Sequence, residues 1–147
     1  MTKLVFSAIP LLATLALFST PVQAETLAIV AHPSLQHTLS EDDIRRIYLG
    51  KLSRLPNGSR ATPLMIRQPD AAHSEFARTV LNRSPKQLNS YWAKRLFTGK
   101  SKPPVPVQNL EEMKAMVAKN KGYIGYLLLS DTDESVKTVF VAAASPS

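Results

Sequence analysis

The sequence predicts an α/β domain with a central mixed sheet and helices on both faces. Short apolar runs typical of buried strands alternate along the chain with segments of helical periodicity, and this alternation is typical of layered α/β folds. The run Tyr123–Leu129 is continuously apolar. A strand of that kind is buried on both faces and therefore needs helices above and below it.

The first 24 of the 147 residues are expected to be a secretory signal peptide. Lys3 gives the basic start, Leu4–Phe18 the apolar run and Val22–Ala24 a small-residue cleavage site. A retained membrane anchor is the alternative, but the run is broken by a proline and a serine and is shorter than the roughly 20 residues of a membrane span. We therefore expect a periplasmic chain of 123 residues that forms one domain at 25–147.

The first strand is predicted at Thr26–Ala31 because the run is short and apolar. Ser40, with Asp43 three residues later, predicts the start of a helix that ends at Gly50. After a loop, the partly β-branched run Thr62–Ile66 predicts the second strand.

Two helices are expected next, one capped by Asp70 and one that begins at Ser84 and ends at Gly99. Such closely connected helices usually pack together, so one face of the second helix should point inward. The residues on that face are Leu88, Tyr91, Trp92 and Leu96.

The remaining chain begins with Lys100–Gln108, whose three prolines indicate an extended crossover. Asn109 then caps the next predicted helix, and Gly122 ends it. The strand Tyr123–Leu129 and a last strand at Val136–Ala142 complete the predicted sheet.

The charge is concentrated in one segment. Without Lys3 the chain has 17 basic and 11 acidic residues, a net charge of +6. No acid occurs between Phe76 and Leu110, where all of the following fall: Arg78, Arg83, Lys86, Lys94, Arg95, Lys100 and Lys102. The resulting field suits small anions, anionic envelope surfaces or an acidic partner, and a basic face that serves only solubility is the alternative. Nucleic acid is not an expected partner, because the segment contains no such motif.

The junction after the strand Thr62–Ile66 is the candidate binding site. Arg67 closes the strand, and the helix after Asp70 directs free N–H groups and its positive dipole end to the same place. This arrangement favours an anion. A salt bridge between Arg67 and Asp70 that only pins the turn is the alternative.

The chain resembles the type II periplasmic binding proteins of the phosphate-transport class, which deliver anions to ABC importers. The resemblance rests on LSEDDIRRIYLGKLSRLPNGS (Leu39–Ser59), PLMIRQPDAAHSEF (Pro63–Phe76) and NKGYIGYL (Asn120–Leu127). It implies a single lobe of the type II periplasmic-binding-protein fold, since 123 residues suffice for only one of the family's two lobes.

The resemblance also implies a small oxyanion, such as phosphate, as the ligand. In the family the arginine is followed after three residues by Ser-Gly-Thr, whose hydroxyls and N–H groups hold phosphate. Here Ala71, Ala72 and His73 stand at those positions, so two hydroxyls are gone while the main-chain donors remain. The implied ligand-binding residues are Arg67, Asp70, Ala71, Ala72, His73 and Ser74.

Catalysis, metal binding and cofactors are not expected. Asp70, His73 and Ser74 are the residue types of a hydrolase triad, but on one helical turn they cannot form the required relay. The only other histidines, His32 and His37, give no metal-binding spacing. Cysteine is absent from the sequence, which excludes disulfides and thiol chemistry.

Two functional hypotheses follow. The first is a periplasmic solute-binding-like protein that binds a small oxyanion without catalysis. Its expected partners are an ABC transporter membrane component or another envelope protein, and a second copy of the chain that supplies the missing wall as a homodimer. The alternative is an envelope interaction module that docks an acidic partner through the basic segment Arg78–Lys102.

Overall fold

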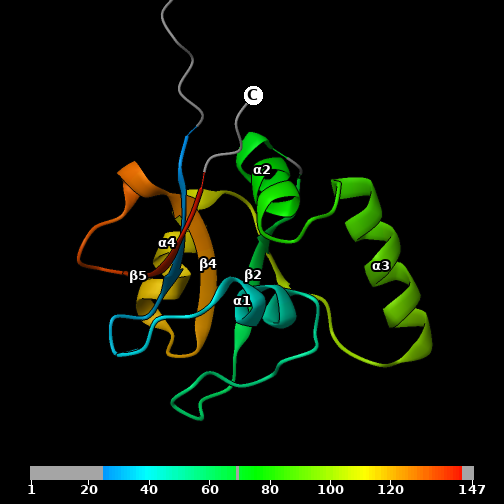
Figure 1. Ribbon diagram of the computed structural model, residues 1–147, viewed down its shortest axis with the longest axis horizontal. Coiled ribbons are helices and arrows are strands. Elements are labelled where there is room, and N and C mark those ends of the chain that lie inside the picture. The colour runs from blue at the N-terminus through cyan, green and yellow to red at the C-terminus, as the bar shows by residue number, and fades with distance from the viewer. Residues whose placement is uncertain (1–24, 69, 144–147) are drawn as a thin grey trace, which may run out of the picture.

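The computed structural model describes residues 25–68 and 70–143, so the predicted signal peptide lies outside the described residues. Strands and helices alternate along the chain (Figure 1). They are β1 (Leu27–Ala31), α1 (Glu41–Tyr48), β2 (Thr62–Ile66), α2 (Ala71–Thr79), α3 (Pro85–Thr98), β3 (Val105–Val107), α4 (Leu110–Lys119), β4 (Tyr123–Leu128), a 3-10 turn at Leu129–Asp131, and β5 (Lys137–Ala142). Within these ranges no helix has the length and apolarity of a membrane span.

The five strands form one mixed sheet in the order β3-β2-β4-β1-β5. Strand β1 runs antiparallel to β4 and β5, whereas β2 runs parallel to β3 and β4. All five residues of β1 and the four central residues of β4 are buried. The predicted α/β class with a mixed sheet is therefore confirmed.

Helices cover both faces of this sheet. A Cβ atom on Gly125 would lie 2.8 Å from Met113, so this side of β4 lies against α4. The next residue, Tyr126, stacks its ring on Phe76 of α2 with 4.2 Å between centroids, and it lies 6.4 Å from the ring of Tyr48 in α1. Because successive strand residues point to opposite faces, α4 covers one face and α1 and α2 cover the other.

The helix starts agree with the predicted caps. Ser40 and Ser84 form capping boxes at α1 and α3, while the side chains of Asp70 and Asn109 accept hydrogen bonds at the starts of α2 and α4. Each cap satisfies a backbone N–H that the helix itself leaves without a partner. Local sequence therefore sets where helices α1 to α4 begin.

Two predictions needed correction. The crossover Lys100–Gln108 contains the short strand β3, which pairs with β2 and accommodates Pro106 because it lies at the sheet edge. The prediction that Leu96 faces inward was wrong, since its side chain is 56% exposed. Helix α3 packs mainly on α2 at the side of the molecule, so only Leu88 and Trp92 of the helix are buried (Figure 1).

Strands β2 and β4 separate after only two paired positions, which are Thr62 with Tyr123 and Pro63 with Ile124. The hydroxyl of Tyr48 lies at this point, 2.9 Å from the carbonyl oxygen of Leu64 in β2 and 3.2 Å from that of Ile124 in β4. Buried backbone groups without partners are costly. Tyr48 therefore replaces part of the missing ladder between the two strands.

The hydroxyl of Tyr126 serves the next position of the split. It accepts a hydrogen bond from the N–H of Ile66 at 3.1 Å. Burial raises the pKa of both Tyr48 and Tyr126, so both hydroxyls keep their protons and can donate. We call Tyr48, Tyr126 and the backbone groups they bind the tyrosine bridge.

The substitution Tyr48→Phe should destabilise the protein by about 1–3 kcal/mol, because it removes the buried hydroxyl that donates to the carbonyl oxygen of Leu64. Urea unfolding monitored by circular dichroism measures this change. Tyr123→Phe, at the half-buried start of β4, is the control and should change stability by less than about 0.5 kcal/mol. Equal losses in the two variants would contradict a specific role for the Tyr48 hydroxyl.

Candidate functional site

The candidate site lies where β2 ends and α2 begins. The backbone N–H of Arg67 donates to the carbonyl oxygen of Val107 at 2.8 Å, which continues the pairing of β2 with β3. The Arg67 side chain is exposed. Among the described side chains no ion pair joins Arg67 to Asp70, so the structure does not contain the salt bridge considered as an alternative.

Asp70 occupies the start of α2 with its own carboxylate. Its Oδ1 accepts the N–H of His73 at 2.8 Å, and its carbonyl oxygen accepts the N–H of Ser74 at 3.0 Å. Two donors at this terminus are therefore already used. The N–H groups of Ala71 and Ala72 have no acceptor among the described residues and point out of the helix start.

The ring of His73 belongs to the core and is only 5% exposed. Its Nδ1 lies 3.3 Å from the hydroxyl of Tyr126, which accepts from the N–H of Ile66. The direction of this hydrogen bond is set by the tautomer of the ring, since either Nδ1 or the hydroxyl can carry the shared proton. Burial lowers the pKa of His73, while the nearby charge of Asp70 opposes this shift.

The structure thus separates the sequence-predicted residues into two groups. Arg67, Asp70 and Ala71 lie on the exposed side of the junction, and Ala72 is half-buried beside them. The His73 side chain points into the protein and anchors α2. Sequence reasoning missed Tyr126, because a tyrosine in an apolar strand gives no sign that its hydroxyl meets a histidine 53 residues earlier.

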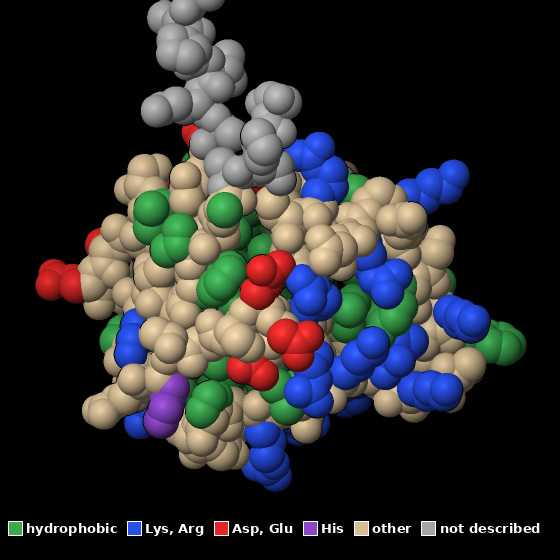
Figure 2. Space-filling model, viewed as in Figure 1, with side chains coloured by type: hydrophobic (Ala, Val, Ile, Leu, Met, Phe, Trp, Pro, Cys, Tyr) green, Lys and Arg blue, Asp and Glu red, His purple; other side chains and the backbone are tan. Residues whose placement is uncertain are grey.

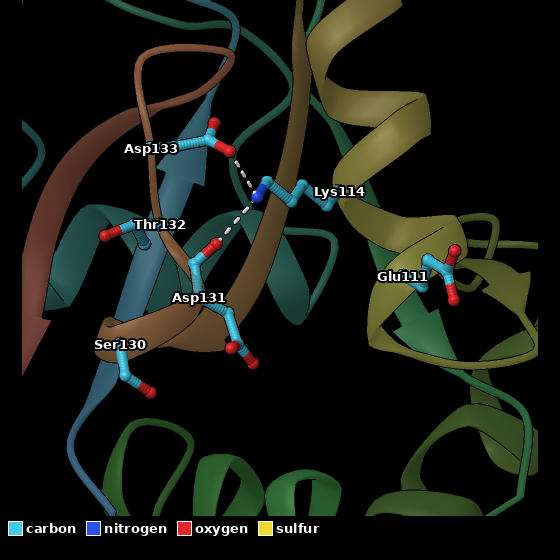
Figure 3. A pocket seen from close by; sticks show the side chains of 6 residues that line it. All are labelled: Glu111, Lys114, Ser130, Asp131, Thr132 and Asp133. Atoms are coloured by element: carbon cyan, nitrogen blue, oxygen red, sulfur yellow. Dashed lines mark hydrogen bonds and ion pairs between the residues drawn. The ribbon is translucent and has the colours of Figure 1, made fainter.

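A second polar site lies between α4 and the turn after β4 (Figure 3). The ammonium group of Lys114 donates to Asp133 Oδ2 at 2.6 Å and to the carbonyl oxygen of Asp131 at 2.8 Å. Asp133 also accepts from the backbone N–H and the hydroxyl of Ser135. Lys114 is thus paired with Asp133, and the cluster ties the turn to the helix.

The five-stranded mixed sheet with helices on both faces matches one lobe of solved phosphate-binding proteins of the periplasmic-binding-protein fold. A phosphate ABC transporter substrate-binding protein with bound phosphate from Clostridium perfringens matches with a TM-score of 0.64 and 18% identity, covering 80% of this chain and 46% of that chain. An ABC-type phosphate transport receptor from Vibrio cholerae matches with a TM-score of 0.62 and 17% identity, covering 78% of this chain and 45% of that chain.

PstS from Borrelia burgdorferi matches with a TM-score of 0.60 and 12% identity, covering 84% of this chain and 49% of that one. The chain therefore spans about half the length of the structures it matches. At these identities the likeness is one of fold, and it confirms the predicted single-lobe architecture. The sequence matches no family model and no curated protein.

The buried His73 predicts a loss of stability on acidification. Because burial lowers the folded-state pKa, the unfolded chain takes up a proton below about pH 6.5 that the folded protein resists. The wild type should therefore lose more free energy of unfolding between pH 7 and pH 5 than His73→Gln, whose uncharged amide can both donate to and accept from the hydroxyl of Tyr126.

Urea unfolding at pH 7, 6 and 5 makes this comparison. His37→Gln removes an exposed histidine and should retain the wild-type pH dependence. Identical slopes for wild type and His73→Gln would contradict the assignment of the acid sensitivity to the buried ring.

The carboxyl group of Asp133 should titrate with a pKa of about 2, since hydrogen bonds from Lys114 and Ser135 stabilise its charged form. Its contribution to stability is complete above the ordinary pKa of aspartate and is lost as the pH falls through the folded value. Lys114→Met should raise the Asp133 pKa toward its ordinary value in a carbon-detected NMR titration. An unchanged pKa in that variant would show that Lys114 is not responsible.

Proposed function

We propose that the protein binds a small oxyanion, such as phosphate, at the junction of β2 and α2 without catalysing a reaction. The observation that carries this proposal is the exposed Arg67 beside a helix start where the N–H groups of Ala71 and Ala72 have no acceptor among the described residues. A guanidinium group and main-chain donors at a helix terminus are the usual protein ligands of an oxyanion.

The fold supports the same proposal. One structural neighbour, the protein from Clostridium perfringens, is described as a phosphate ABC transporter substrate-binding protein with bound phosphate. By analogy, the present chain is a solute-binding-like protein of the periplasm, exported through the predicted signal peptide. Its proposed partners are an ABC transporter membrane component or another envelope protein.

The proposed site should be weak for two physical reasons. The carboxylate of Asp70 already places a negative charge at the helix start and would repel an arriving anion. The described lobe forms one wall of the site, and an anion open to solvent is screened by salt and competes with water. A second copy of the chain could supply the opposite wall.

Isothermal titration with phosphate and sulfate at low ionic strength tests the proposal. Wild type should bind with millimolar affinity, and Arg67→Ala should lose the binding. Asp70→Asn should bind up to about tenfold more tightly, because it removes the repelling charge while the asparagine side chain still caps α2.

Arg46→Ala is the matched control, since Arg46 is an exposed arginine of α1 that lies outside the junction. It should retain the wild-type affinity. The absence of heat from both anions at millimolar concentration would refute the proposal. An equal loss of affinity in Arg46→Ala and Arg67→Ala would mean that Arg67 acts only through general charge attraction.

A further inference from the structure

A basic groove of about 740 Å³ lies between the end of α1, the connection from α2 to α3, and α3 itself. Its floor includes the apolar groups of Leu49, Leu81 and Tyr91. No acidic residue lines the groove. Its five basic residues are Arg45, Lys51, Arg83, Lys86 and Lys94. Figure 2 shows basic side chains gathered on the side of the molecule that carries α3.

Both arginines of the groove are held in place by contacts within the protein. The guanidinium carbon of Arg83 lies 4.8 Å from the ring centroid of Tyr91, whose hydroxyl donates to the carbonyl oxygen of Leu49 at 2.6 Å. Arg45 donates through Nε to the carbonyl oxygen of Val80 at 3.0 Å and pairs with Glu41 at 2.8 Å. Such fixed cations lose little side-chain freedom when a ligand arrives.

The three lysines carry uncompensated charge. Lys51, Lys86 and Lys94 are exposed, and none of them forms an ion pair within the described part of the chain. Lys86 and Lys94 are eight residues apart on α3, which corresponds to about 12 Å along the helix. A ligand with several linked phosphates matches that separation and can approach both lysines at once.

We propose that this basic groove binds an oligophosphate, meaning a ligand that carries two or more phosphate groups close together. Concentrated negative charge matches the four basic residues of the groove that form no ion pair within the described residues, which are Lys51, Arg83, Lys86 and Lys94, and it would relieve their mutual repulsion. The site is separate from the junction at Arg67, because neither Arg67 nor the start of α2 lines the groove.

The phosphate groups could belong to a free oligophosphate or to lipid headgroups. The second source is considered because Leu96 and Phe97, which are 56% and 94% exposed, lie at the end of α3 beyond the groove lining. Apolar side chains beside a basic surface can insert into an anionic bilayer. An acidic protein segment is a different class of ligand and is an outcome of the test.

The test is titration of the protein with sodium tripolyphosphate in low salt, monitored calorimetrically. Wild type should bind tripolyphosphate more tightly than phosphate, and the affinity should fall as salt is added. The double variant Lys86→Glu with Lys94→Glu should lose at least tenfold in affinity. Both lysines are exposed, and a wild-type circular dichroism spectrum and melting temperature would confirm that the variant is folded.

Two controls separate this site from other effects. Lys119→Glu with Lys121→Glu makes the same change of charge at exposed positions of α4 and its flank, and it should bind like wild type. Arg67→Ala should also bind tripolyphosphate like wild type, so failure of the oxyanion site at the junction would leave this result unaffected.

The source of the phosphate groups is identified by sedimentation with phosphatidylglycerol vesicles. Binding to vesicles that is weakened by Phe97→Ser would support lipid headgroups as the ligand, and binding to tripolyphosphate alone would support a soluble ligand. The proposal is overturned if tripolyphosphate gives no heat, if the control pair of substitutions weakens binding equally, or if a polyglutamate peptide binds more tightly than tripolyphosphate.

Discussion

The buried hydroxyl of Tyr126 is the contact on which the candidate site depends. It accepts the N–H of Ile66 at the end of β2 and shares a hydrogen bond with Nδ1 of His73 in the first turn of α2. The same ring stacks on Phe76, one turn further along the helix. One side chain of β4 therefore fixes both the end of the strand and the start of the helix, and with Tyr48 it completes the tyrosine bridge across the split sheet.

Stability and anion binding make opposite demands on the start of α2. Asp70 stabilises the helix because its carboxylate accepts the N–H of His73 and complements the helix dipole. The same charge weakens the attraction of Arg67 for an anion. The basic groove beside α3 has no carboxylate in its lining. The two proposed sites therefore differ in chemistry, one suited to a small oxyanion at low affinity and the other to an extended anion.

Much of the fold could be predicted because its signals are local. The caps at Ser84 and Asn109 act within three residues, and they mark the helix starts correctly. Strand β3 was missed because Pro106 argues against a strand when the sequence is read locally. The strand forms through its pairing with β2. The position of Arg67 at the strand end was also predictable, but the burial of His73 was not, since it depends on the distant hydroxyl of Tyr126. Burial along α3 likewise depends on which neighbours reach the helix.

The central claim is that the start of α2, beside Arg67, holds two backbone donors without an acceptor among the described residues, the N–H groups of Ala71 and Ala72. Backbone amide chemical shifts of the nitrogen-15-labelled protein, followed during titration with phosphate, test this claim directly. The account predicts that the largest shifts occur at Ala71 and Ala72, with smaller changes at His73, whose N–H is bound to Asp70. Shifts confined to the basic groove, with Ala71 and Ala72 unchanged, would contradict it.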